Sequence, residues 1–507
     1  MKLRIDRKIF SMGLVGCAIA LSLSTCLAEP VGLTLAESIG MALATNETID
    51  IADARREAAE HALRAARRSM GPSVRWESQA YRIGGRDYQA ANDAHDAYGD
   101  PHAGDLSPIY LSGEGLPVLG APETVGSYAY RNTFSNSWSL TVPLYTGGQT
   151  EGQIEANRYR LNSADLDTEN TRQTVRYEAA EAYANLVHRE NLVLVAREAV
   201  DHGNTQLELI RAQFEEGAVA EADLLMMNVN TANYRQNLVN AEAAVSVAKS
   251  TLASVVGLPQ DTDIEPLDVF SYEAYGKELP DCERYALEHR PDGVAAEYAI
   301  KTAEAQKEAA KSGWRPSVAA VASQRISSNQ PFRSERNNAW EAGLSISWPL
   351  FDNGVTASNV RQAEANLKAY EAEARRVQKA IRLETRTAYL EMKAAERNIQ
   401  ETAAAVEQAE DSYMIARIRY EEGVDNLLGV TDAQEKLTQA RSNYLTALYQ
   451  YNLFRARLEK AMGVPVGFDA LRYREAEQEG ASPAKAVRRA SLFQEATEGE
   501  HGQDEEQ

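Results

Sequence analysis

The chain has 507 residues, a formal net charge of −21 and only 7% aromatic residues. Beyond the N-terminal segment, no stretch approaches the roughly 18 apolar residues that a membrane-spanning helix requires, which excludes a bundle of apolar membrane helices. The negative charge argues against a nucleic-acid partner, because phosphates bind basic surfaces. It fits a solvated acidic surface and the wall of a cation-tolerant channel equally well.

Residues 1–28 are typical of an export signal. Basic residues precede an apolar run that extends from Ile9 to Leu27, and Ala28 supplies a small residue for cleavage. A lipoprotein site that acylates Cys26 is the alternative, but threonine is a poor fit immediately before a lipidated cysteine. Cleavage after Ala28 leaves Cys282 as the only cysteine, so we expect no intramolecular disulfide.

Residues 29–265 are predicted to form a helix, two strands with a long connection, and two long helices. From Phe134 to Val142, apolar residues occupy most even positions (Trp138, Leu140 and Val142 among them), and Ser and Thr occupy the odd positions. Val74 to Ile83 is a weaker strand. Such alternation is typical of a transmembrane barrel strand, and also of a half-buried strand in a soluble sandwich.

The connection between these strands, residues 84–131, is rich in Gly, Pro, Asp and Tyr, and we expect it to be a long outer loop. It contains possible metal ligands at Asp93, His95, Asp96, Asp100, His102 and Asp105. Their spacing matches no defined metal site, and a loop of Gly and Asp is usually solvated. We therefore expect neither a metal nor a cofactor.

The tract from Leu144 to Leu258 contains no proline and is rich in good helix formers. The stretch from Gly152 to Glu216 would be about 97 Å long as one continuous helix, at about 1.5 Å per residue. Gly217 then predicts the turn of a long helical hairpin. Gly203 is a possible further break in the tract.

Residues 266–465 repeat this plan. The sequence VPLY at 142–145 recurs as WPLF at 348–351, a shift of 349 − 143 = 206, and the same shift relates Gly217 to Gly423. A duplication this regular predicts one structural plan built twice. Gly429 is a possible helix break without a counterpart in the first copy.

The second copy has strand-like segments at 318–325 and 340–348. All five tryptophans of the chain lie in or beside the four strand-like segments: Trp76, Trp138, Trp314, Trp340 and Trp348. Aromatic residues at strand ends suit a membrane-interface girdle. We therefore predict a lipid-facing set comprising Trp138, Leu140, Val142, Trp340, Leu344, Ile346 and Trp348.

Four strands do not close a barrel, because single-chain outer-membrane barrels begin at about eight strands. An open sheet edge in hydrocarbon leaves backbone groups unpaired, each at a cost of several kcal/mol. Membrane-spanning strands would therefore require an oligomer. The helices alone leave an alternative open, a non-channel periplasmic or surface coiled-coil scaffold, because polar, Ala-rich helices suit both a rod and a tube wall.

With these features the chain resembles the TolC family of outer-membrane export channels over residues 33–465. The most specific element is RYEEG at 419–423 followed by VTDAQ at 430–434, which is similar to the family's motif at the second hairpin tip. The first copy has a weaker version, FEEG at 214–217 with Asp223.

The resemblance implies an α+β membrane protein: a homotrimer with a 12-stranded transmembrane β-barrel in the outer membrane, continued by a long α-helical periplasmic tunnel. It implies a passive conduit for drug or small-molecule efflux or type I protein secretion, fed by an inner-membrane pump through a periplasmic adaptor protein. The adaptor is expected to dock at the tips, at Gly217 and Gly423.

The resemblance also implies a periplasmic gate. Asp432 matches an aspartate ring, and Tyr420 and Asp223 match a tyrosine–aspartate link. Gly429 stands where the family has a second ring aspartate, and Asp425 where it has a linking arginine, so we expect weaker closure.

Residues 466–507 are predicted to form an acidic, largely unstructured periplasmic tail. The sequence contains no phosphate-binding glycine loop, metal-ligand spacing or nucleophile motif, so we expect no enzymatic activity.

Overall fold

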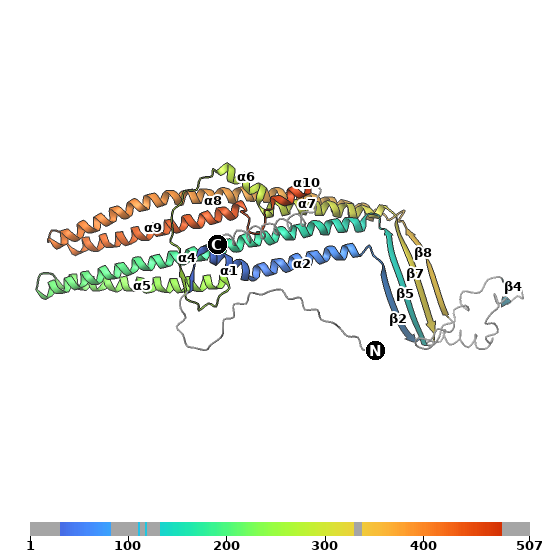
Figure 1. Ribbon diagram of the computed structural model, residues 1–507, viewed down its shortest axis with the longest axis horizontal. Coiled ribbons are helices and arrows are strands. Elements are labelled where there is room, and N and C mark those ends of the chain that lie inside the picture. Colours follow the sequence, from blue (N-terminus) through green and yellow to red (C-terminus); the bar gives the residue numbers. More distant parts are fainter. Residues whose placement is uncertain (1–30, 83–109, 112–116, 119–131, 329–336, 479–507) are drawn as a thin grey trace, which may run out of the picture.

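The molecule is an elongated rod of helices with a four-stranded sheet at one end (Figure 1). The computed structural model describes residues 31–82, 110–111, 117–118, 132–328 and 337–478. The predicted signal segment and the candidate metal ligands of the loop at 84–131 lie outside these residues. Two helical hairpins extend from the middle of the rod to the end opposite the sheet.

The first half of the chain contains two short helices, a strand pair and a long hairpin. Its elements are β1 (Val31–Leu33), α1 (Leu35–Thr45), α2 (Glu47–Arg68), β2 (Ser73–Arg82), β3 (Tyr110–Leu111), β4 (Pro117–Val118), β5 (Asn132–Tyr145), α4 (Gln149–Glu215), α5 (Glu221–Val256) and β6 (Ile264–Pro266). The short strands β1 and β6 pair in parallel and bring the beginning and end of this half together.

The second half follows the same order. Its elements are α6 (Leu279–His289), α7 (Pro291–Ala310), η1 (Lys311–Trp314), β7 (Ser317–Ser328), β8 (Asn337–Ser347), α8 (Val355–Glu421), α9 (Leu427–Met462) and α10 (Leu471–Gln478). Among the residues described, no helix combines the length and the apolar character needed to cross a membrane.

The long helices keep the offset found in the sequence. Both α4 and α8 have 67 residues, and their first residues differ by 355 − 149 = 206. Both α5 and α9 have 36 residues, with an offset of 427 − 221 = 206. At about 1.5 Å per residue, a 67-residue helix is about 100 Å long, which the proline-free sequence permits.

Gly203 and Gly429 do not break their helices, so that part of the sequence prediction is wrong. Gly203 lies buried within α4, where a Cβ atom would lie 2.8 Å from Cδ2 of Tyr234. Its missing side chain lets α5 approach α4 closely. Gly429 lies in the first turn of α9, and its N–H donates to Oδ1 of Asn426, the N-cap residue, at 3.0 Å.

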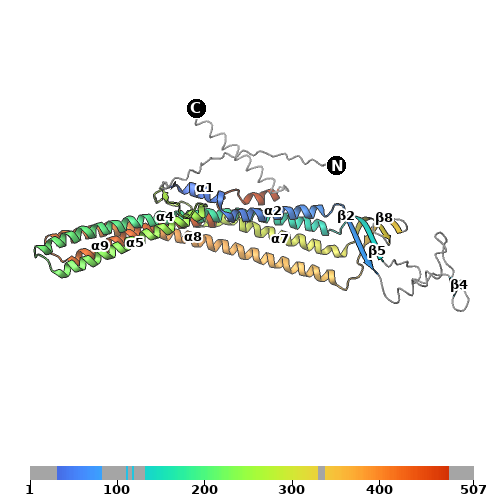
Figure 2. The ribbon, with the colours of Figure 1, turned by 90° about the horizontal axis from the view of Figure 1, so that it is seen from below.

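The helices around the middle of the rod hold the two halves together. Helix α7 packs against both α4 and α8, and α2 packs along α4 (Figure 2). One apolar core joins α1, α4 and α5, with Leu186 and Leu252 fully buried. A second joins α6, α8 and α9, with Met392 and Tyr451 fully buried. Each hairpin therefore has a core at its base.

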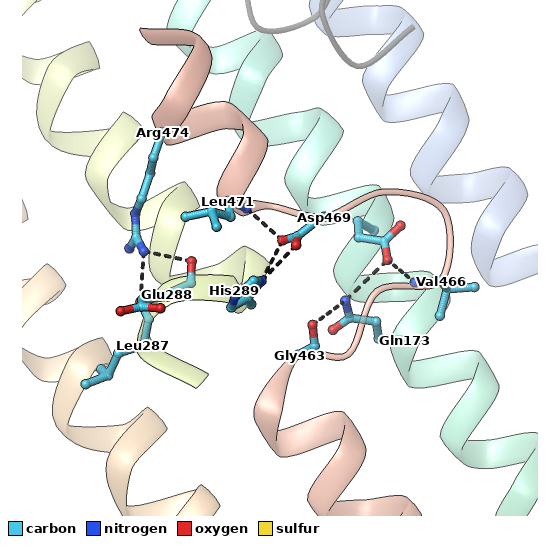
Figure 3. A network of polar contacts seen from close by, with 10 residues as sticks. Gln173, Leu287, Glu288, His289, Gly463, Val466, Asp469, Leu471 and Arg474 are labelled. Atoms are coloured by element: carbon cyan, nitrogen blue, oxygen red, sulfur yellow. Dashed lines mark hydrogen bonds and ion pairs between the residues drawn. The ribbon is translucent and has the colours of Figure 1, made fainter. Parts of the chain in front are cut away.

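The segment after α9 is folded, so the prediction of an unstructured tail is wrong for residues 466–478. The buried carboxylate of Glu169 on α4 accepts hydrogen bonds from three successive backbone N–H groups, at residues 466–468 (2.7–3.3 Å). Asp469 contacts Nδ1 of His289 at 2.8 Å, and Arg474 donates to the carbonyl oxygens of Leu287 and Glu288 (Figure 3). Helix α10 then buries Tyr473. Residues 479–507 lie outside the described part.

Candidate functional site

The sheet has the order β2-β5-β7-β8, with every neighbouring pair antiparallel. It contains the four segments that the sequence predicted to be strands. Trp348 lies one residue beyond β8, where its Nε1 donates to the carbonyl oxygen of Trp314 at 3.2 Å. In the described part of the chain, the outer strands β2 and β8 each have only one neighbouring strand.

One face of this sheet is apolar. The register places Trp76 opposite Trp138, with ring centroids 6.0 Å apart, and places Trp138 and Trp340 opposite the same residue of β7. Directly paired residues share a face, and so do alternate residues of a strand. Six of the predicted lipid-facing residues therefore lie on one face: Trp138, Leu140, Val142, Trp340, Leu344 and Ile346.

These apolar side chains are open to solvent in the single chain. Trp340, Leu344 and Ile346 on the edge strand β8 are 79%, 68% and 70% exposed. The opposite face is polar: it aligns Arg75, Ser139, Ser323 and Glu341 across the four strands. An exposed apolar patch of this kind marks a surface that binds protein or membrane.

The two hairpin turns at the other end of the rod are built alike. Gly217 and Gly423 adopt positive φ angles of 77° and 72°, which glycine tolerates without steric cost. Each donates its N–H to the carbonyl three residues earlier, and the next residue donates its N–H to the carbonyl five residues before itself, as in a helix C-cap. Both glycines lie at the turns that follow the two 67-residue helices.

The predicted gate residue Tyr420 joins the two hairpins, but through another partner. Its hydroxyl donates a hydrogen bond to Oε1 of Gln213 on α4 at 3.2 Å. Burial and, secondarily, the charge of Asp223 raise the pKa of Tyr420. Asp223 therefore lies near Tyr420 and affects it electrostatically, whereas the hydrogen bond within this chain goes to Gln213. Gln213 carried no motif in the sequence and was missed.

Asp432 lies in α9 and pairs with a lysine of its own helix. Nζ of Lys436 is 2.6 Å from Oδ2 of Asp432, and both side chains are more than half exposed. Asp425, which replaces the linking arginine expected from the family, lies 3.5 Å from Arg419 of α8. Asp425 and Asp432 therefore each lie next to a basic group of the same hairpin.

Two further contacts between the hairpins were not found from the sequence. Arg441 on α9 pairs with Glu198 on α4 and with Glu410 on α8. Closer to the base, His188 on α4 stacks on Tyr449 on α9, with ring centroids 4.7 Å apart. The offset of 206 relates Arg441 to Arg235 but does not indicate the contact partners, because each contact joins different positions of the two copies.

Burial lowers the pKa of His188 to about 4, because its imidazole lies away from water and beside the positive charge of Arg189. Among the described residues, no group of three or more His, Cys, Asp or Glu side chains could hold a metal ion.

The described chain is thus an amphipathic sheet, whose outer strands each have one neighbour among the described residues, joined to helices about 100 Å long. The chain belongs to the outer membrane efflux protein family, whose model matches residues 38–258 and 284–464. This confirms the family and the outer-membrane location predicted from the sequence.

Relatives of known role support the same family. The toluene efflux pump outer membrane protein TtgF of Pseudomonas putida is 28% identical over 282 residues, which are 53% of this chain and 56% of TtgF. The pyoverdine export outer membrane protein OpmQ of Pseudomonas aeruginosa is 22% identical, over 66% of this chain and 69% of OpmQ. The match thus spans little more than half the length of the first of these relatives.

The fold matches solved structures over most of its length. The outer membrane protein VceC of Vibrio cholerae superposes with a TM-score of 0.67 at 20% identity, over 85% of this chain and 96% of VceC. The Campylobacter jejuni CmeC outer membrane channel gives a TM-score of 0.70 at 17% identity, over 90% of this chain and 89% of CmeC.

Proposed function

We propose that this protein is the outer-membrane channel of a three-part export system, a passive conduit without enzymatic activity of its own. The observation that carries the proposal is the sheet: one face gathers large, exposed apolar side chains, and both outer strands lack a second neighbour in the described residues. The sheet stands at the end of the rod opposite the hairpin tips (Figure 1). A rod-shaped scaffold in solution would not require an exposed apolar sheet face.

The sheet edges support a trimer. Two copies would bring eight strands, and an eight-stranded barrel is filled by its own side chains. Three copies bring 3 × 4 = 12 strands, which can enclose a water-filled lumen while pairing every edge. The apolar face would then contact lipid, and the face with Arg75, Ser139, Ser323 and Glu341 would line the lumen.

The hairpins supply the wall of a periplasmic tunnel and its entrance. Their tips expose apolar side chains, among them Val424 (68%) and Leu428 (62%) at the second turn. Such residues suit the docking of an adaptor protein's helices near Gly217 and Gly423, with an inner-membrane pump beyond. Asp223, Tyr420 and Asp432 lie at this end and are the gate residues that we propose.

The names of TtgF and OpmQ refer to toluene and pyoverdine. We therefore propose small-molecule efflux ahead of type I protein secretion as the transported class. Selection of the substrate would belong to the pump, because a polar tunnel wall is permissive.

Extraction and conductance test the proposal together. Membranes that contain the full chain are treated with 6 M urea and, separately, with detergent, and the extracted protein is added to planar bilayers. A channel stays in the membrane in urea, migrates as a heat-labile trimer on unboiled detergent gels and gives discrete conductance steps. Release by urea as a monomer without conductance would instead identify the coiled-coil scaffold.

A further inference from the structure

A small cavity lies where the four helices of the two hairpins meet, between the tips and the Arg441 ion pairs. Its volume is about 20 Å³, and α4, α5, α8 and α9 all contribute to its lining. Three lining residues, Gln206, Tyr234 and Gln434, each carry a solvent-shielded polar atom without a hydrogen-bond partner among the described residues. Tyr234 and Gln434 are only 8% and 7% exposed.

The unpaired atoms have complementary chemistry. Nε2 of Gln206 can only donate a hydrogen bond, Oε1 of Gln434 can only accept one, and the Tyr234 hydroxyl can do both. They also come from both hairpins: Gln206 and Tyr234 from the first, Gln434 from the second. Buried polar atoms in proteins normally have partners, supplied by the protein or by ordered water.

The size of the cavity and the residues that line it indicate which ligand it can bind. A cavity of about 10–15 Å³ is enough for one water molecule, and a buried water needs two to four polar partners. None of the residues that line this cavity is Asp or Glu. A cation would therefore lack a counter-charge and would face the N–H donor of Gln206, whereas a water molecule can accept from that donor.

The local sequence creates this space. Gly203 has no side chain, so the ring of Tyr234 lies against bare α4 backbone, where a Cβ atom would lie 2.8 Å from Cδ2. Thr231, one turn before Tyr234, donates its hydroxyl to the carbonyl oxygen of Gly203 at 3.3 Å and fixes this approach. This close approach places the Tyr234 hydroxyl at the contact between the two hairpins.

We propose that the cavity is a binding site for a single water molecule that links the first hairpin to the second. The water accepts a hydrogen bond from Gln206, donates one to Gln434 and exchanges one with the Tyr234 hydroxyl. Because a water molecule can change partners in place, this link holds the hairpins together and still permits small relative movement. A dry, interlocked apolar contact would resist such movement.

The variant Gln434→Met in the full-length protein tests the site through the sign of its effect on thermal unfolding in detergent. Methionine has a similar shape but no acceptor, and Thr438→Val corrects for the hydrogen bond that Nε2 of Gln434 donates to Oγ1 of Thr438 at 3.4 Å. If the water is bound, the substitution leaves Gln206 and Tyr234 without a complete partner set, and the unfolding midpoint falls by roughly a few degrees. If the cavity is dry, removal of an unpaired carbonyl raises the midpoint, which overturns the proposal. Gln408→Met, on the exposed surface of α8, is the matched control.

A double variant provides a second readout. Because one water would serve both glutamines, Gln206→Met combined with Gln434→Met should lower the midpoint by little more than the larger single change. Additive changes would show that no water is shared. A crystal structure of the unsubstituted protein at a resolution that shows ordered waters should place one within hydrogen-bond distance of at least two of the three side chains. An empty cavity would reject the site.

Discussion

The hydroxyl of Tyr420, in the last turn of α8, donates a hydrogen bond to Oε1 of Gln213, in the last turn of α4, at 3.2 Å. This bond ties the two hairpin tips of one chain together at the end of the rod. Family resemblance pointed to Asp223 as the partner of this tyrosine, and Asp223 does lie close enough to raise the pKa of Tyr420. Whether Gln213 or Asp223 is the functional partner of Tyr420 determines which substitutions should open the proposed gate.

Removal of the tyrosine hydroxyl should loosen the tip. We expect Tyr420→Phe to increase single-channel conductance in planar bilayers, because a hydrogen bond of about 1 kcal/mol between the hairpins is lost. Gln213→Leu should give the same increase, and the double variant should add little. If Asp223→Asn reproduces the effect while Gln213→Leu does not, the aspartate is the functional partner. Tyr370→Phe, at an exposed site on α8, is the control.

Asp432 should contribute to cation selectivity at the entrance. Three carboxylates on a narrow axis would attract multivalent cations, so Asp432→Ala should weaken block by such cations or raise the conductance. Lys436→Ala should act in the opposite direction, because Nζ of Lys436 lies 2.6 Å from the Asp432 carboxylate and offsets its charge. Unchanged conductance and unchanged block in both variants would remove Asp432 from the gate.

The buried His188 predicts a loss of stability in mild acid. Its pKa falls from 6.5 to about 4 on folding, so the unfolded chain takes up a proton at a higher pH than the folded chain. The stabilising contribution is complete above pH 6.5 and is lost as the pH falls towards 4, up to about 3 kcal/mol per chain.

The measurement is the difference in thermal stability between the unsubstituted protein and His188→Phe from pH 7 to pH 4. Phenylalanine preserves the stack on Tyr449 and cannot take up a proton. The variant should lose less stability than the unsubstituted protein over this interval. Parallel curves would mean that His188 is already accessible to protons in the folded protein.

The two faces of the sheet should respond differently to a charge. Leu344→Arg places a cation on the apolar face, where it costs about 2–4 kcal/mol per chain near the centre of a bilayer. Ser345→Arg places the same group on the polar face of the same strand. We expect Leu344→Arg to abolish heat-labile trimers on unboiled gels and Ser345→Arg to preserve them. Equal tolerance of both would argue against lipid on the apolar side.

Local pattern determined much of the fold. The regular offset of 206, the proline-free tracts and the glycines at the turns predicted helices whose observed bounds keep that offset. The period-two alternation predicted strands whose register gathers Trp138 and Trp340 on one face. These features depend on backbone conformation and side-chain periodicity, which short stretches of sequence express directly.

The pairings between distant side chains could not be predicted in this way. Glu169 holds residues almost 300 positions away, which turned an expected tail into a folded segment. Gly203, interpreted from the sequence as a helix break, instead admits the ring of Tyr234. The local sequence around a helical glycine is the same whether the glycine ends the helix or makes room for a side chain of a packed helix.

The sequence by itself determined the duplicated plan, the long hairpins, the amphipathic strands and the family. Only the tertiary structure decided which residues meet across the hairpins: Tyr420 with Gln213, Arg441 with Glu198 and Glu410, and the three polar side chains around the small cavity. The physical reason is that periodicity specifies which face of a helix is buried, whereas the contact partner depends on the axial shift and rotation between packed helices.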